Sequence, residues 1–260
     1  MNESHLLEAC DVRFGYSPGV PVVSGVSLAV ARGSLCALIG PNGCGKSTLI
    51  RLFAGVLQAQ AGEIRLDGVP LHGIPRKEAA KRIAYVPQST AMAFPFTALE
   101  VVLTGRSPYT PRFRFENDSD RARALDALDT VGALHLASRP VTELSGGERQ
   151  MVAVARALAQ EPACLLLDEP SAALDLKHRA ALVRTLVRLR DTRGLTALVV
   201  THDLHLIDPV FDRVCAIRGG SVIARGSPAE VLRDGVLAEI YDDAHDRTTR
   251  VDGRTMIWSE

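Results

Sequence analysis

A glycine-rich stretch that also carries a lysine and a serine is the first group of residues whose types and spacing could do chemistry. Residues 40–48 fit the pattern Gly, any four residues, Gly-Lys-Ser/Thr. The apolar residues 34–39 before it predict a buried strand, and residues 49–54 after it have helical spacing. In that context the backbone N–H groups of the loop turn inward around a phosphate, and the start of the helix adds partial positive charge.

Two side chains of this loop are of types that contact a nucleoside triphosphate and its metal ion. Lys46 is predicted to reach the β- and γ-phosphates, and the hydroxyl of Ser47 is predicted to ligate Mg²⁺. The alternative is a chance glycine-rich turn, which the flanking strand and helix disfavour. We therefore predict that the chain binds a nucleoside triphosphate through the loop residues Gly40, Pro41, Asn42, Gly43, Cys44, Gly45, Lys46, Ser47 and Thr48.

Two adjacent carboxylates, Asp168 and Glu169, follow the apolar run 163–167, which is typical of a strand covered on both faces. Solvation alone does not explain them, because the chain is only just leaving the core at this point. In a nucleotide site such carboxylates divide the chemistry. Asp168 is predicted to hold the hydrated Mg²⁺, and Glu169 is predicted to orient or deprotonate the attacking water.

Three further side chains could serve the same site, and each has an alternative. Gln88 ends the predicted strand 83–87 at the ligand-binding edge of a parallel sheet, although most such glutamines are solvated loop residues. His202 follows the predicted strand 195–200 and could contact the γ-phosphate or be a satisfied core histidine. Tyr16 lies on a turn and could stack on an adenine ring or remain a surface residue.

A second glycine pair begins another predicted helix. Ser145 is placed as the N-cap of this helix, and Glu148 three residues later gives the spacing of a capping box. Gly146 and Gly147 expose unobstructed N–H groups at the helix start, which is again an anion site. Two interpretations stay open, a cap and turn alone or a second phosphate contact.

Length and composition restrict the class of protein. The 260 residues carry a formal net charge of zero, so nothing indicates a nucleic-acid-binding surface. The N-terminus lacks a signal-peptide pattern, and no apolar run approaches the length that crosses a bilayer. The five cysteines lack C-x-x-C spacing and lie mostly in apolar runs, which favours buried thiols in a reducing compartment over disulfides or a metal site. We expect a cytosolic protein whose membrane role would come through a partner.

The elements that must position these residues follow from the spacing of apolar and turn residues. Loose alternation predicts antiparallel strands over residues 6–14 and 20–30, and a strand over 62–71 that closes at an Asp-Gly turn. Helical patterns without a strand fill the insert between residues 89 and 162. One long helix there is predicted to be capped by Asp118, Ser119 and Asp120 and to carry Ala122, Leu125, Leu128 and Val131 on its apolar stripe. Other predicted elements are helices over 76–82, 98–103, 180–190 and 228–241, a hairpin over 214–223 with Gly219-Gly220 at its turn, and an Asp-Gly hairpin signal in the tail.

With these motifs assembled, the sequence resembles the nucleotide-binding subunits of ABC transporters over nearly the whole chain. The decisive motif is Leu-Ser-Gly-Gly-Glu-Arg-Gln at residues 144–150, which is similar to the signature of that family. The resemblance implies that Tyr16 stacks on adenine, that Gln88 links the nucleotide to a transmembrane partner, and that His202 is the switch histidine.

A short loop after the acidic pair also matches the family. Residues 171–175 are similar to the loop that crosses the dimer interface, and they include Ser171 and Asp175. The family often has threonine where this chain has Ser171, and the substitution keeps the hydroxyl. The resemblance therefore implies a dimer contact at both residues.

The resemblance also implies the fold and its division. We expect an α/β P-loop NTPase (RecA-like) fold, with a mixed-sheet core, an antiparallel β subdomain and an inserted all-helical subdomain. Residues 1–260 would form a single ABC ATPase domain. Within it, residues 5–88 and 163–241 would make the nucleotide-binding core with the β subdomain, 89–162 the helical subdomain with the signature, and 242–260 a C-terminal tail.

The family works as a head-to-tail dimer, and the residues show why one copy is insufficient. The phosphate loop offers donors to one side of the γ-phosphate only, so Ser145, Gly146 and Gly147 are expected to act in trans. ATP would close the dimer, and its hydrolysis would reopen it and drive a transmembrane partner. The implied cofactors are ATP and Mg²⁺, the implied catalytic residues are Glu169, His202 and Lys46, and the implied Mg²⁺ ligands are Ser47, Gln88 and Asp168.

The kind of transporter rests on one further segment. Residues 98–109, with Gly-Arg-x-Pro at 105–108, are similar to the same segment in ATPases of ferric-siderophore, haem and cobalamin importers. That resemblance implies a homodimer on the cytoplasmic face of the bacterial inner membrane, with a polytopic permease and, indirectly, a periplasmic or surface substrate-binding protein as partners. Two alternatives stay open, an importer ATPase for another substrate such as molybdate or zinc, and a soluble ABC ATPase without transport. The loop 106–115 could dock on the permease or be solvated.

Overall fold

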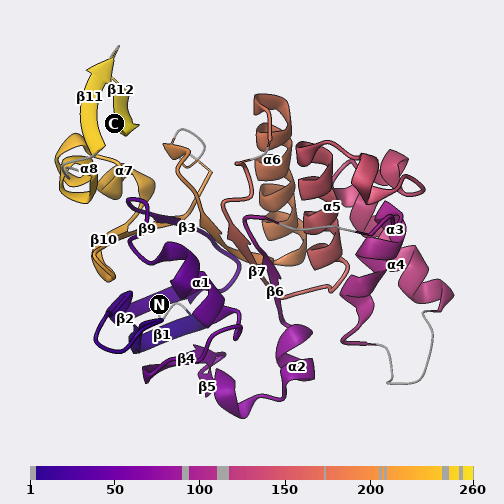
Figure 1. Cartoon of the computed structure of the whole chain (residues 1–260), viewed down its shortest axis with the longest axis horizontal. Coiled ribbons are helices and arrows are strands. Elements are labelled where there is room, and N and C mark those ends of the chain that lie inside the picture. Colours follow the sequence, from indigo (N-terminus) through magenta and orange to yellow (C-terminus); the bar gives the residue numbers. More distant parts are fainter. Residues whose placement is uncertain are drawn as a thin grey trace. The chain divides into compact units, whose positions relative to one another are not determined.

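The computed structural model describes residues 4–89, 94–109, 117–172, 174–204, 207, 210–241, 246–251 and 254–259. These residues pack as two compact units, Met1–His72 with Leu198–Glu260 in the first and Gly73–Ala197 in the second (Figure 1). The phosphate loop, Tyr16 and His202 lie in the first unit, whereas the acidic pair and the signature lie in the second.

The first unit contains a four-stranded antiparallel sheet with the strand order β2-β1-β4-β5. On β2 the buried side chains of Val26, Leu28 and Val30 alternate with more exposed ones, as expected for a sheet with one covered face. Asp67 and Gly68 form the predicted turn between β4 and β5. The strands are β1 His5–Phe14, β2 Val23–Ala31, β4 Ala61–Leu66 and β5 Val69–Pro70, which confirms the expected antiparallel part.

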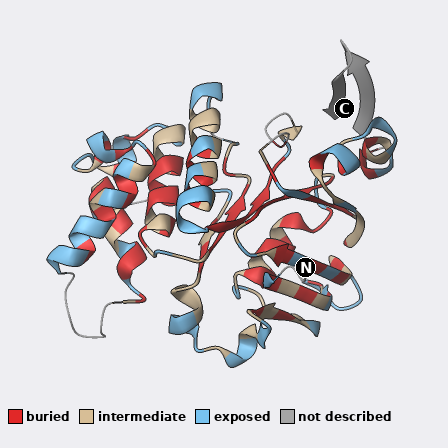
Figure 2. Ribbon diagram, turned by 180° about the vertical axis from the view of Figure 1, so that it is seen from behind, coloured by how far each residue is buried: buried red, intermediate tan, exposed pale blue. Residues whose placement is uncertain are grey.

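A second group of strands in the first unit positions the phosphate loop. β3 (Leu35–Ile39) pairs in parallel with β9 (Arg213–Arg218), and β9 pairs antiparallel with β10 (Ser221–Gly226). Every residue of β3 is buried, as its continuous apolar run predicts (Figure 2). The helix α1 (Lys46–Phe53) begins directly after the loop. The expected context of strand, glycine loop and helix is therefore confirmed.

The prediction of one helix over residues 228–241 is wrong. The structure has α7 (Pro228–Val231) and then α8 (Asp234–Tyr241). Leu232 adopts φ −85° and ψ 24°, which leaves the helical region and ends α7. The continuous apolar spacing hid this break, because it depends on backbone angles and not on which residues are apolar.

The tail forms a hairpin of β11 (Asp246–Val251) and β12 (Arg254–Ser259), paired antiparallel. This pairing confirms the hairpin signal in the sequence. The Asp-Gly turn itself lies outside the described residues.

The strands of the second unit carry the acidic pair. β6 (Ile83–Val86) and β7 (Cys164–Asp168) are parallel neighbours, with Ile83 opposite Cys164. β8 (Thr196–Val200) has residues in both units, since the division falls between Ala197 and Leu198. β7 and β8 are each buried along their whole length. The run before the acidic pair was predicted as a strand covered on both faces, and residues 195–200 were predicted as a strand; both predictions are confirmed. The remaining elements are the turn η1 (Leu71–Gly73) and the helices α2 (Arg76–Ala80) and α6 (Leu176–Arg193).

Helices fill the rest of the second unit as far as the structure describes it. The described residues between 94 and 162 form one isolated β-bridge, between Thr97 and Pro140, but no β-strand. The expected helical insert is thus confirmed. Its elements are α3 (Ala98–Leu103), η2 (Thr104–Arg106), α4 (Asp118–Thr130), η3 (Leu134–Leu136), η4 (Val141–Glu143) and α5 (Gly146–Leu158).

Two details of α4 differ from the prediction. The cap is Asn117, whose side chain accepts a hydrogen bond from the Asp120 N–H at 2.9 Å, so Asp118, Ser119 and Asp120 form the first turn and not the cap. The predicted stripe is right in part, since Leu128 and Val131 are buried, Leu125 is half-buried and Ala122 is exposed. The buried face also includes Ala124, Ala127 and Asp120, whose carboxylate accepts a hydrogen bond from Arg106.

Candidate functional site

The phosphate loop runs from the end of β3 to the start of α1, and its shape depends on two glycines. Gly40 has φ +147° and Gly45 has φ +106°, both in the region that side chains rarely adopt. A Cβ on Gly40 would lie 2.0 Å from the carbonyl oxygen of Ile217, and one on Gly45 would lie 2.6 Å from that of Val22. Only glycine fits these two positions, so the loop can curl as the motif requires.

Lys46 lies inside this loop. The side chain is only 5% exposed, and its Nζ donates hydrogen bonds to the carbonyl oxygens of Gly40 at 2.8 Å and Pro41 at 2.7 Å. These bonds fix the ammonium across the loop, where its charge can also act on phosphate oxygens. Ser47 follows it in the first turn of α1 and is half-buried.

Two residues far along the chain anchor the loop, and sequence reasoning missed both. The N–H of Gly40 donates to the hydroxyl of Tyr241 at 3.2 Å, and the N–H of Gly220 donates to the carbonyl of Cys44 at 3.1 Å. Tyr241 is buried and lies 201 residues beyond its partner. No local pattern could reveal a contact over that separation.

The structure joins Tyr16 to the loop helix. The Tyr16 hydroxyl lies 3.3 Å from the Thr48 hydroxyl, within hydrogen-bond distance, and its ring packs edge-on against Phe14 with centroids 5.0 Å apart. The residue nevertheless remains 58% exposed. A flat aromatic face is therefore held beside the loop while staying open to a ligand.

The cysteines are free thiols and four of the five are buried, as the sequence predicts. Burial raises the pKa of the Cys44 thiol, and the nearby Lys46 ammonium offsets part of that rise. Burial likewise raises the pKa of Cys36 to about 12. Cys44 therefore stays protonated at neutral pH and serves the loop through its backbone.

His202 directly follows β8 and Thr201. The N–H of Thr201 donates to the carbonyl of Leu38 in β3 at 3.2 Å, and the Thr201 hydroxyl accepts from the Asp203 N–H at 3.0 Å. His202 itself is exposed, so it is not the satisfied core histidine that the sequence left open. Its exposure at the end of β8 lets it meet a ligand there.

In the second unit the ends of β6 and β7 bring three predicted site residues together. Gln88 Nε2 donates to Glu169 Oε2 at 2.8 Å. Asp168 is completely buried and accepts a hydrogen bond from the Tyr85 hydroxyl at 3.3 Å. Glu169 adopts φ +49°, a left-handed conformation that costs a non-glycine residue about 1–3 kcal/mol and that three other described non-glycine residues share.

The signature residues form the predicted capping box at the start of α5. The Ser145 hydroxyl accepts from the Glu148 N–H at 3.2 Å, and the Glu148 carboxylate accepts from the Ser145 N–H at 2.8 Å. The bonds from Ser145 lower the pKa of Glu148, which keeps the box intact at neutral pH. Gly146 is exposed and Gly147 is half-buried, so their amides can be approached from outside. The cap is real, and a second role toward phosphate is compatible with it.

The predicted interface loop ends in the N-cap of α6. Asp175 Oδ1 accepts hydrogen bonds from the backbone N–H of His178 and from its Nδ1, both at 2.8 Å. These bonds lower the pKa of Asp175. The N–H of Leu174 donates to the carbonyl of Ser171 at 3.1 Å. The Asp175 side chain is 65% exposed, which suits a residue that meets another protein surface.

The predicted magnesium ligands fit the chemistry of the ion. Ser47, Gln88 and Asp168 offer hydroxyl, amide and carboxylate oxygens, the hard donors that Mg²⁺ prefers, and the buried Asp168 suits a contact through a held water. The described residues contain no cluster of His, Cys, Asp and Glu that could hold a metal by itself.

The loop, the acidic pair and the fold define a P-loop nucleotide-hydrolysing protein. A family model described as ABC transporter matches residues 23–172. The hemin import ATP-binding protein HmuV of Streptomyces coelicolor is 44% identical over 86% of this chain and 79% of its own length. The iron(3+)-hydroxamate import ATP-binding protein FhuC of Bacillus subtilis is 37% identical over 87% of this chain and 84% of its own length.

Solved structures agree with this classification. A metal-chelate type ABC transporter in an inward-facing conformation matches with a TM-score of 0.81 and 26% identity, covering 99% of this chain and 98% of the other. A dimeric ATP-binding cassette in a post-hydrolysis state with ADP and Pi matches with a TM-score of 0.76 and 29% identity, covering 85% and 98%. The chain belongs to the ABC transporter family and is its ATP-binding, ATP-hydrolysing subunit. Among the described residues no helix has the length and apolar character to cross a membrane.

Proposed function

We propose that this chain is the energy-coupling ATPase of an importer for an iron chelate, with haem as the first candidate and ferric siderophores as the second. The names of the relatives support the substrate class, and the haem relative has the higher identity. Cobalamin, named only through the resemblance of residues 98–109, stays a third candidate.

The observation that carries the catalytic assignment is the hydrogen bond between Gln88 and Glu169. Glu169 acts as the base that orients or deprotonates the attacking water. Gln88 links that carboxylate and the nucleotide to the transmembrane partner. Ser47, Gln88 and Asp168 would hold Mg²⁺, which would supply positive charge to the phosphate oxygens. His202 and Lys46 contact the γ-phosphate.

A homodimer completes the site. Lys46 and the loop amides serve one side of the γ-phosphate, and Ser145, Gly146 and Gly147 of a second copy serve the other. Ser171 and Asp175 lie at the interface between the copies. Closure on ATP expels water from the shared site, and hydrolysis removes the group that both copies hold. The dimeric state of the matching ATP-binding cassette supports this arrangement.

The partner of the dimer is a polytopic permease, which a substrate-binding protein supplies on the outer side. The chain then works on the cytoplasmic face of the bacterial inner membrane. This arrangement is drawn from the import proteins that it resembles.

The adenine contact gives a first testable prediction. Tyr16→Ala should weaken ATP binding by about 5–150-fold, since stacking of a base on an aromatic ring contributes about 1–3 kcal/mol. Tyr16→Phe keeps the ring and loses only the contact of its hydroxyl with Thr48, so its affinity should stay within about threefold. Titration of each variant with ATP measures this difference, and equal affinities of the Ala and Phe variants would contradict the stacking role.

Import itself is tested in cells that lack their own haem uptake and express this chain together with a candidate haem permease. Wild-type chain should allow growth on haem as the iron source and should co-purify with a polytopic membrane protein. Glu169→Gln should abolish growth, whereas the exposed-site control Glu78→Gln should support it. Growth on ferric hydroxamate instead of haem would move the assignment to siderophores. Recovery of the chain in a soluble complex without a membrane protein would overturn the importer assignment.

A further inference from the structure

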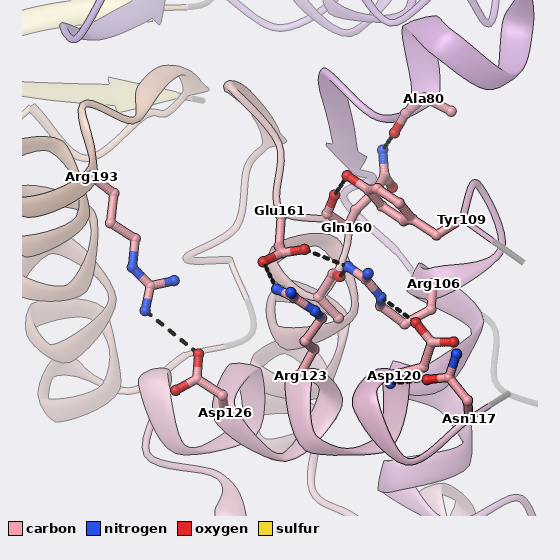
Figure 3. A network of polar contacts seen from close by, with 11 residues as sticks. Ala80, Arg106, Tyr109, Asn117, Asp120, Arg123, Asp126, Gln160, Glu161 and Arg193 are labelled. Carbon is pink, nitrogen blue, oxygen red and sulfur yellow. Dashed lines mark hydrogen bonds and ion pairs between the residues drawn. The ribbon is translucent and has the colours of Figure 1, made fainter.

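The arginine of the Gly-Arg-x-Pro segment is not a solvated loop residue. Arg106 is 4% exposed, and its guanidinium is used on several sides (Figure 3). Nε donates to Asp120 Oδ1 of α4 at 3.0 Å, and Nη1 donates to the carbonyl of Ala159 at 2.6 Å and to Glu161 Oε2 at 2.9 Å. A buried charge with this many directed bonds fixes the groups around it.

The network continues from Arg106 to the sheet. The Tyr109 ring stacks on the guanidinium, with Arg106 Cζ 4.0 Å from the ring centroid, and its hydroxyl donates to the carbonyl of Gln160 at 3.0 Å. Gln160 Nε2 in turn donates to the carbonyl of Ile83 at 2.7 Å, at the start of β6. It also donates to the carbonyl of Ala80 (Figure 3). The bonds therefore run without a gap from η2 through the C-terminal end of α5 to β6.

We propose that this clasp, made of Arg106, Tyr109, Asp120, Gln160 and Glu161, is a positioning device that sets the angle of α5 against β6 and β7. All five residues lie in the second unit. α5 begins at the signature and ends at the clasp, β6 ends just before Gln88, and β7 ends in Asp168. Arg106 thus acts on hydrolysis through the residues that it holds, as a positioning residue.

The length of α5 makes its far end sensitive to the clasp. Its 13 residues span roughly 20 Å, so a tilt of about 5° at the clasp moves the start of the helix by about 1.7 Å. Misplacement of catalytic groups by about 1 Å can cost on the order of 100-fold in rate. Such a tilt would move Ser145 and the N–H donors of Gly146 and Gly147, which lie at the start of α5.

The chemistry of the clasp favours positioning over stability. A buried ion network gains little stability over well-packed apolar side chains, because desolvation offsets the attraction between the charges. Its forked, directional bonds instead select one geometry. Gly105 adds to this fit, since a Cβ there would lie 2.1 Å from the carbonyl of Arg156 in α5. The turn η2, which carries Arg106, therefore packs directly against α5.

The first test is Arg106→Lys in the full chain. The lysine keeps the charge but cannot reach Asp120, the Ala159 carbonyl and Glu161 at once. We expect kcat for ATP hydrolysis per folded chain to fall about tenfold, while the affinity for ATP, set by the loop of the first unit, changes less than about twofold. The matched control is Arg193→Lys, which touches only the exposed pair of Arg193 with Asp126 at 3.5 Å and should keep wild-type kcat (Figure 3). A role in stability alone would lower the melting temperature and leave kcat per folded chain unchanged.

A milder variant guards against loss of folding. Glu161→Gln changes a side chain that is 42% exposed and weakens its ion pairs with Arg106 and with the exposed Arg123, so kcat should fall about threefold with a normal melting curve. Hydrogen exchange provides a readout without activity. The amide of Cys164, which donates to the Arg82 carbonyl at 2.9 Å between β7 and β6, should exchange faster in Arg106→Lys than in Arg193→Lys.

The inference rests on the proposed roles of Ser145 and Glu169, and the two can fail separately. ATP hydrolysis at the wild-type rate by Glu169→Gln would refute the proposed site. The hydrogen-exchange comparison would still decide whether the clasp restrains β6 and β7. Unchanged kcat in both Arg106→Lys and Glu161→Gln, together with unchanged exchange at Cys164, would overturn the clasp.

Discussion

Glu169→Gln is expected to lower kcat for ATP hydrolysis by about 10²–10⁴-fold, the usual contribution of a general base. An amide cannot take the proton of the attacking water, but it has nearly the same size as the carboxylate. Its carbonyl oxygen can still accept the hydrogen bond from Gln88, and the buried Asp168 is untouched. Nucleotide binding should therefore survive while the chemical step stops.

The same variant should accumulate as an ATP-bound dimer, because closure no longer leads to hydrolysis. Gel filtration with light scattering, run with ATP and Mg²⁺, would detect the doubled mass. Glu78→Gln is the matched control, since Glu78 pairs with Lys81 on the surface and lies outside the site. Glu169→Gln that remains monomeric at saturating ATP would contradict either the base or the dimer.

Lys46→Ala is expected to weaken ATP binding by about 10–100-fold, because a charge-assisted hydrogen bond contributes about 1.5–3 kcal/mol. The substitution also leaves the carbonyls of Gly40 and Pro41 without the ammonium that bridges them. Lys46→Arg keeps the charge, but the larger fork does not fit a site that is only 5% exposed, so its affinity should also fall.

Calorimetric titration of ATP into Lys46→Ala measures this loss, with Lys77→Ala on the exposed face of α2 as the control. A melting curve of each variant separates weaker binding from unfolding. ATP affinity that matches wild type in a folded Lys46→Ala would refute the phosphate contact.

The parts of the fold that were predictable are those in which local sequence and burial agree. The runs that became β3, β7 and β8 are continuously apolar because neighbouring layers cover both of their faces. The loop after β3 was predictable because its glycines answer to steric limits of the backbone, such as the 2.0 Å approach at Gly40. The capping box at Ser145 is likewise local.

The features that escaped prediction depend on partners far away in the sequence. Tyr241 reaches Gly40 across 201 residues, and nothing near either residue signals the bond. Asp120 lies on the buried face of α4, where its carboxylate accepts a hydrogen bond from Arg106, and an apolar stripe does not predict a buried carboxylate. The Gly-Arg-x-Pro segment indicated a transporter class by resemblance, but its place at the end of the signature helix is visible only in the structure.

The central claim is that each ATP is held by Lys46 of one copy and by Gly146 of the other, and mixing two inactive chains tests it most directly. Lys46→Ala disables the loop, and Gly146→Asp puts a negative charge beside the γ-phosphate while an acidic residue at a helix start still suits the fold. In a two-fold dimer an equal mixture of the two variants should regain roughly a quarter of wild-type ATPase activity, because half of the dimers are mixed and each has one intact site. Two results together would contradict the account. The mixture of the two variants would stay inactive, and a dimer of one wild-type chain with one doubly substituted chain would keep half of the wild-type activity, which would show that each copy completes its own site.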